Sequence, residues 1–233
     1  MTFIDRLGKG VIRFLNEMGA MGLLFFQAFI FIFRPPFRFR NLLKQMESIG
    51  VGSIPVVLIT ASFTGMVLAL QSYHGFKRFN AEGLVGTVVA LSMTRELGPV
   101  LTALIVAGRA GAAMAAELGT MKVTEQVDAL ATLAVNPIQY LVTPRFIAGI
   151  IMLPMLTIFS DFIGIAGGYA ISINLLGANA GVYLRRTTQY LEMEDILGGL
   201  LKAAVFGGII AGVSCYKGFQ AEGGAEGVGR ATT

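Results

Sequence analysis

Four long stretches of the sequence contain almost no charged residues: they cover residues 54–73, 83–108, 146–181 and 196–216. A helix needs about 20 apolar residues to cross the hydrocarbon core of a bilayer, and each stretch reaches that length. A backbone inside a membrane must also satisfy its own hydrogen bonds, which a helix does. The sequence therefore predicts an all-α integral membrane protein in which this chain contributes four transmembrane helices.

The composition favours the same class of protein. Of the 233 residues, 55% are hydrophobic and only 14% are charged, whereas soluble domains carry about 25% charged residues. The 30 glycines and other small residues recur at helical spacing, which predicts close helix packing. The single cysteine, Cys215, excludes an internal disulfide and a cysteine-based metal site. The sequence also contains no Walker-type phosphate loop, so we do not expect this chain to bind ATP.

Lysine and arginine are distributed unevenly around the four stretches. If the N-terminus is cytoplasmic, 12 of the 18 basic residues lie in cytoplasmic segments, 4 lie outside, and Arg95 and Lys202 lie within the stretches. This bias follows the positive-inside rule and predicts that the loop 109–145 is cytoplasmic. It also accounts for the net charge of +4 without nucleic-acid binding, for which no basic patch with interleaved aromatic residues is present.

The first 53 residues differ from the rest of the chain. Residues 1–17 place Phe3, Ile4 and Leu7 on one helical face and charged residues on the other, which is typical of a helix lying in the membrane interface. The uncharged run 18–33 reaches only about 24 Å, less than a bilayer core, and it ends at the basic, proline-containing segment 34–40. We expect interfacial and re-entrant or connecting helices over 1–53 and a single transmembrane domain over 54–233.

Arg95 and Glu96 stand near the middle of an otherwise apolar stretch. Charges at that depth cost several kcal/mol unless they are paired or hydrated. Neighbouring residues on a helix point about 100° apart, so these two cannot easily satisfy each other. Asp161 and Lys202, the other charges inside the stretches, are their natural partners. The pair either holds helices together or faces a cavity that receives a polar group.

The cytoplasmic loop contains a mildly amphipathic segment, 117–130, which ends before Asn136-Pro137. Its apolar residues are interleaved with charged ones. This pattern is typical of a solvated connecting helix or of a surface helix that docks to another protein. We expect a short helix over about 117–132.

Several motifs together resemble the MlaE-type permeases, which are the membrane subunits of ABC transporters that work with MCE proteins on phospholipids. The central motif begins Arg95-Glu-Leu-Gly-Pro and continues to residue 111. Further matches lie at 65–71, 116–121, 124–130, 136–137, 144–146 and 222–233. The resemblance extends over nearly the whole chain. In the family, the last of these motifs leads into a final helix, so a fifth transmembrane helix is expected after Thr233.

The resemblance implies a permease subunit that moves phospholipid between the inner membrane of a Gram-negative bacterium and a periplasmic MCE protein, which maintains the lipid asymmetry of the outer membrane. It implies a homodimer with an MlaF-type ATPase, an MlaD-type MCE ring and an MlaB-type STAS protein as partners. The chain itself would be a transport subunit and not an enzyme, with no cofactor or metal, because ATP and magnesium would bind to the ATPase.

The resemblance also assigns roles to particular residues. Those expected to line the lipid cavity are Leu68, Tyr73, Phe76, Phe79, Arg95 and Glu96. The segment 117–132 corresponds to a coupling helix that receives motion from the ATPase, and its expected contact residues are Glu117, Glu125 and Asp128. Two alternatives stay open, namely a membrane anchor or scaffold for partner subunits and a stand-alone secondary transporter. The latter predicts inverted repeats, which the sequence does not show.

Overall fold

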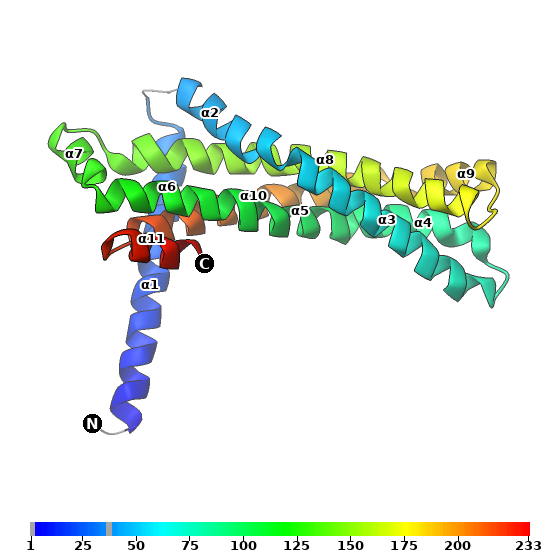
Figure 1. Ribbon diagram of the computed structural model, residues 1–233, viewed down its shortest axis with the longest axis horizontal. Helices are drawn as coiled ribbons and strands as arrows, with labels where there is room; N and C mark the ends of the chain where they lie inside the picture. Colours follow the sequence, from blue (N-terminus) through cyan, green and yellow to red (C-terminus); the bar gives the residue numbers. More distant parts are fainter. Residues whose placement is uncertain (1–2, 36–38) are drawn as a thin grey trace. The chain divides into compact units, whose positions relative to one another are not determined.

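The computed structural model describes residues 3–35 and 39–233, which form helices and contain no strand (Figure 1). The predicted all-α class is therefore confirmed. Five helical stretches are long and apolar enough to cross a membrane: Gly8–Ile32, Phe39–Lys77, Glu82–Val123, Ile138–Asn174 and Met193–Phe219. The last four contain the predicted stretches 54–73, 83–108 and 196–216 and most of 146–181, whose final seven residues lie beyond the end of the fourth span at Asn174.

Helix α1 (Phe3–Ile32) differs from the expectation of separate interfacial and re-entrant helices, because it is one continuous helix of 30 residues. The chain has no proline before Pro35 and therefore no strong helix stop in this region. The predicted apolar face of Phe3, Ile4 and Leu7 involves side chains outside the described part of the structure. Residues 36–38 of the basic segment also lie outside it.

The chain divides into two compact units, which we describe separately. Unit 1 comprises residues 1–42, 111–147 and 209–233. It contains α1, α6 (Ala112–Val123), α7 (Gln126–Thr132), η5 (Ile138–Val142), α11 (Gly224–Thr232) and parts of α2, α8 and α10. Helix α11 packs on α6, and α1 runs across the direction of α6 (Figure 1). Most large apolar side chains of α1 are exposed, including Phe14 and Phe26. These exposed apolar side chains fit contact with lipid, and the interfacial position expected for residues 1–17 stays a prediction.

Unit 2 comprises residues 43–110 and 148–208. It contains η1 (Val51–Ser53), α3 (Ile54–Lys77), η2 (Glu82–Leu84), α4 (Val85–Ser92), η3 (Met93–Leu97), α5 (Gly98–Val106), most of η4 (Ala107–Gly111), α9 (Ala180–Tyr190) and the larger parts of α2 (Phe39–Ile49), α8 (Thr143–Asn174) and α10 (Met193–Phe219). Its core includes Ala61, Ala69, Val85, Val89, Met93 and Tyr183. Helix α8 continues through Pro154 and ends at Asn174.

The close packing predicted from small residues at helical spacing occurs on α8, where a stripe of small residues is part of this core. Its members are all buried, and they are Ser160, Gly164, Gly168 and Ser172. Gly164 meets Gly65 of α3 so closely that a Cβ atom on Gly65 would overlap the Gly164 carbonyl group. The small residues therefore let the backbones of α3 and α8 approach each other, as small residues do in membrane helix packing.

This close approach predicts opposite effects for the same substitution at two positions of α3. Gly65→Ala should destabilise the protein by about 1–3 kcal/mol, because the new methyl group overpacks the contact with α8. Gly75→Ala is the matched control, since a Cβ atom there meets no neighbour within 4 Å, and it should stabilise the helix slightly. Thermal unfolding of the purified variants measures both. Equal melting temperatures would contradict the packing described here.

Candidate functional site

Arg95 and Glu96 lie in η3, a single turn of π-helix between α4 and α5. In an α-helix, the N–H of residue 99 would donate to the carbonyl of Arg95, but Pro99 has no N–H. Lys202 of α10 supplies the missing donor, because its Nζ lies 2.9 Å from the Arg95 carbonyl oxygen. Pro99 therefore leaves the Arg95 carbonyl free to accept a hydrogen bond from a side chain of another helix.

The charged pair is bound to α10 by two ion pairs. Lys202 Nζ lies 2.6 Å from Glu96 Oε1, and Arg95 Nε lies 2.6 Å from Asp195 Oδ1. Arg95, Glu96, Asp195 and Lys202 form what we call the charged cluster, which has no net charge. Lys202 and Asp195 are seven residues apart, which places them two turns apart on one face of α10.

One of the two predicted partners is confirmed and the other is wrong. Lys202 pairs with Glu96 as expected, but Asp161 pairs with neither residue. It is buried instead, and its carboxylate packs against Gly98 of α5. The true partner of Arg95, Asp195, precedes the apolar stretch 196–216 by one residue, so a search restricted to charges inside the stretches missed it.

Within unit 2, the described residues leave most of the charged cluster uncovered. The side chains of Arg95, Glu96 and Lys202 are 54%, 66% and 43% exposed, and only Asp195, at 9%, is nearly covered. Three charged groups thus lie on the outer surface of helices that are long enough to cross a membrane. Ionisable residues within membrane spans usually face a protein interior or a water-filled cavity.

A shallow groove of about 540 Å³ runs along α3 beside Leu97. Its lining includes Ile59, Phe63, Val67, Leu68 and Gln71, and we call it the α3 groove. Leu97 follows Glu96 directly, so this mostly apolar groove adjoins the charged cluster along the chain. Leu68 is the predicted cavity residue that lies in it.

The other predicted aromatic residues are placed differently. Tyr73 and Phe76 are half-buried and pack against the core of unit 2. Phe79 follows the end of α3 and is 79% exposed. None of the three lines the α3 groove. The structure therefore places Leu68 in the α3 groove, whose lining residue Leu97 follows Glu96 in the sequence, and leaves the three aromatic residues outside the groove.

The predicted coupling segment is not one helix. Residues 117–123 are the end of α6, the chain turns at Thr124 and Glu125, and α7 begins at Gln126. Glu125 adopts a left-handed backbone conformation, with φ of 60°, and this ends the helical path. The expectation of a continuous helix over 117–132 is wrong because amphipathic spacing alone does not reveal a turn of two residues.

The three acidic residues of this segment have different surroundings. Glu117 Oε2 lies 2.7 Å from the NH2 nitrogen of Arg145, which is 3% exposed. Asp128 pairs with Lys122 at 3.0 Å and so joins α7 to α6 across the turn. The Glu125 side chain is exposed and makes no ion pair or hydrogen bond within the described part of the chain. Of the three, Glu125 is the one most open to a partner.

Two arginines form contacts that the sequence did not indicate. Arg145 donates from NH1 to the Leu141 carbonyl at 2.6 Å, in addition to its pair with Glu117. Arg109 donates to Ser53 Oγ at 3.2 Å and to the Ser48 carbonyl at 3.3 Å, which ties the connection between α2 and α3 to η4. Both were expected only as basic residues of the cytoplasmic side.

An all-helical, multi-pass chain with paired charges on its spans and a broken helix in its long loop is typical of the membrane subunit of a transporter. The chain belongs to the MlaE permease family, because the family model described as Permease MlaE matches residues 42–233.

Three relatives illustrate this membership. A probable ABC transporter permease protein of Rickettsia typhi is 54% identical over 233 residues, which are 100% of this chain and 90% of the relative. The intermembrane phospholipid transport system permease protein MlaE of Haemophilus influenzae is 41% identical, again over 100% of this chain and 90% of the relative. The chloroplastic protein TRIGALACTOSYLDIACYLGLYCEROL 1 of Arabidopsis thaliana is 41% identical over 89% of this chain and 59% of its own length.

These similarities establish the class of the chain. It is a multi-pass membrane permease of the ABC transporter type, a transport subunit and not a catalytic one. The family membership favours this function over a stand-alone secondary transporter.

Proposed function

We propose that this chain is the permease subunit of a transporter that moves phospholipid between the inner membrane of a Gram-negative bacterium and a periplasmic MCE protein, and so maintains outer-membrane lipid asymmetry. The relative from Haemophilus influenzae, which is named as an intermembrane phospholipid transport permease, supports this substrate. The observation that carries the proposal is the charged cluster, in which Glu96 and Lys202 are exposed and Glu96 directly precedes Leu97, a lining residue of the apolar α3 groove.

A second copy of the chain would cover this face. Exposed charges within a span are costly against lipid tails, so a homodimer that encloses the cluster and the groove removes that cost. The resulting cavity would be mostly apolar with a few polar anchors, which is the usual composition of a ligand site. The acyl chains of a phospholipid match Leu68 and the α3 groove, and its head group matches Arg95, Glu96 and Lys202.

The predicted aromatic residues have a smaller part in this proposal. Tyr73, Phe76 and Phe79 lie at or beyond the end of α3, so we place them at the outer mouth of the cavity. An MlaD-type MCE ring would receive lipid there. We propose residues 54–233 as the permease domain and residues 1–53 as a separate N-terminal region.

On the cytoplasmic side, α7 and the turn before it are the proposed docking site of an MlaF-type ATPase. Glu125 is the proposed contact residue, while Glu117 and Asp128 hold the segment in shape through Arg145 and Lys122. ATP and magnesium would bind to the ATPase, so this chain would need no cofactor or metal. An MlaB-type STAS protein would associate with the ATPase.

Replacing Glu96 by glutamine tests the cavity directly, because it removes the charge and keeps the shape. We expect phospholipid transfer by the reconstituted complex to fall about tenfold, the equivalent of about 1.4 kcal/mol, while the subunits still co-purify. Glu47→Gln is a matched control, since Glu47 is an exposed residue of α2 outside the cluster. Unchanged transfer in an intact complex would exclude the cavity role. Loss of assembly together with transfer would favour the scaffold alternative.

A further inference from the structure

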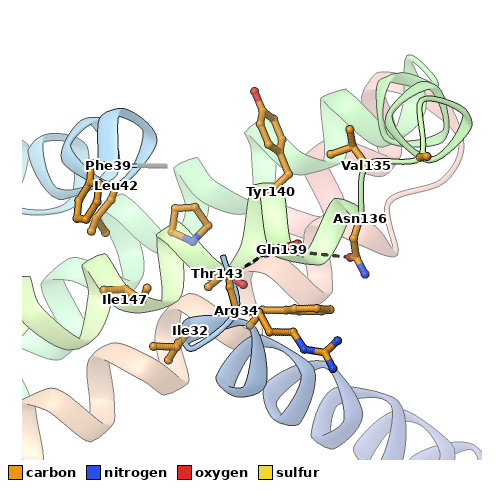
Figure 2. Close-up of a pocket in the computed structure, with 13 residues that line it drawn as sticks. Ile32, Arg34, Phe39, Leu42, Val135, Asn136, Gln139, Tyr140, Thr143 and Ile147 are labelled. Carbon is orange, nitrogen blue, oxygen red and sulfur yellow. Dashed lines mark hydrogen bonds between the residues drawn. The ribbon is translucent and has the colours of Figure 1, made fainter. Parts of the chain in front are cut away.

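A pocket of about 240 Å³ lies in unit 1, and none of its lining residues belongs to the charged cluster or the α3 groove. Three parts of the chain form its walls: the end of α1 with Arg34, the start of α2, and the segment from Ala134 through η5 to the start of α8 (Figure 2). The lining is mostly apolar, with aliphatic side chains that include Ile32, Leu42, Val135 and Ile147 and with three aromatic ones.

Most polar groups of the pocket already serve the backbone. Gln139 Nε2 donates to the carbonyls of Arg34 and Pro35 at 3.1 and 3.4 Å. Asn136 Oδ1 accepts from the Ile138 and Gln139 N–H groups at 2.9 and 3.3 Å. These bonds hold η5 in place and attach it to the connection after α1. The pocket is therefore a built feature whose walls are linked by hydrogen bonds.

Among the described residues that line the pocket, Arg34 is the one that carries a charge. Its guanidinium makes no hydrogen bond or ion pair with any part of residues 3–35 and 39–233. Figure 2 shows the side chain reaching away from Ile32 and Ile147, so the charge lies at the rim and the aliphatic residues lie inside. A planar group with five N–H donors at this position is suited to a phosphate.

An apolar interior with one unpaired cation at its rim matches an anionic amphiphile. The volume is below the roughly 300–1,000 Å³ of sites that enclose a whole small molecule, so the pocket takes part of a larger one. The positive-inside distribution places the segment 34–40 on the cytoplasmic side, where anionic lipid heads attract basic residues.

We propose that this pocket binds an anionic phospholipid of the cytoplasmic leaflet, with its phosphate on Arg34 and an apolar part of the molecule against Ile32 and Ile147. This lipid is not the transported one. It would join the end of α1 to the segment that follows α7. If α7 docks the ATPase, as proposed above, the lipid would also stabilise the base of the docking segment, but the binding itself does not depend on that function.

The sequence contains no tryptophan, so Phe31→Trp places a single fluorophore in the pocket wall. The full chain carrying this change is reconstituted in vesicles that contain brominated phosphatidylglycerol or brominated phosphatidylcholine in varied proportion. Quenching should show that phosphatidylglycerol binds about fivefold more tightly than phosphatidylcholine, because the choline group of the latter offsets the charge of its phosphate, and one basic residue favours an anionic lipid by about 1 kcal/mol. Adding Arg34→Gln to this variant should abolish the preference, so that both lipids bind with about equal affinity.

Phe162→Trp is the control, because Phe162 is an exposed residue of α8 outside the pocket, and it should report no preference. Native mass spectrometry of the chain without added tryptophan, compared with Arg34→Gln, gives a second measurement that needs no fluorophore.

Equal binding of both lipids at Phe31→Trp would overturn the proposal, as would a preference that survives Arg34→Gln. Binding of inorganic phosphate that depends on Arg34, together with equal binding of both lipids, would identify a free anion as the ligand and overturn the proposal. Neither result would affect the transport proposal, which the transfer assay tests.

Discussion

Replacing Glu117 by leucine is expected to destabilise the protein by about 3–5 kcal/mol, because it leaves the Arg145 guanidinium buried without its partner. The opposite change, Arg145→Leu, should cost less. Glu117 is 54% exposed, so water can hydrate its carboxylate once the arginine has gone. A buried apolar side chain in place of Arg145 also avoids the cost of a buried charge.

Thermal unfolding of the purified chain measures this asymmetry, and a loss of this size should lower the melting temperature by on the order of 10 °C. The double variant Glu117→Leu/Arg145→Leu should recover much of it. The same experiment distinguishes two roles for Glu117. If Glu117 were mainly an ATPase contact, Glu117→Leu would keep the parental melting temperature and lose only ATPase coupling, and our account of the pair would be wrong.

Replacing Lys202 by glutamate should have the largest effect on transport. It places a carboxylate beside Glu96 and removes the donor to the Arg95 carbonyl. Like charges at such close range cost several kcal/mol, so we expect phospholipid transfer to fall at least about 100-fold. The melting temperature should fall as well, because α10 loses an attachment to η3.

The charge-swapped double variant Glu96→Lys/Lys202→Glu restores the sign of the ion pair but not the bond to the backbone. It should therefore recover part of the stability. Lys217→Glu is the control, since Lys217 is an exposed residue near the end of α10 and lies outside the cluster. Parental stability and transfer in Lys202→Glu would show that the cluster has neither role.

The features that the sequence predicted correctly depend on local properties of the chain. Transmembrane stretches follow from length and hydropathy, and the small-residue stripe on α8 follows from its spacing. The pairing of Lys202 with Glu96 was predictable because a charge inside an apolar span must be paired and few candidates exist.

The features that the sequence did not predict depend on tertiary contacts or on details of backbone hydrogen bonding. Nothing in the local sequence distinguishes Asp195 as the partner of Arg95, or shows that Arg145 is buried while Arg109 of the same loop is exposed. The π-helical turns and the break at Glu125 change the helix by one or two residues, which is finer than hydropathy patterns resolve. The pocket at Arg34 is formed by segments more than a hundred residues apart.

The most direct test of the proposed transport function is to detect phospholipid in the α3 groove. A photo-cross-linking amino acid at Val67, an exposed residue in the groove, is compared with the same amino acid at Phe162 on α8 in a purified complex that carries radiolabelled phospholipid. Our account predicts strong labelling at position 67 that decreases when ATP is added, and weak labelling at position 162 that does not change. Equal labelling at the two positions, or labelling at position 67 that ATP leaves unchanged, would contradict it.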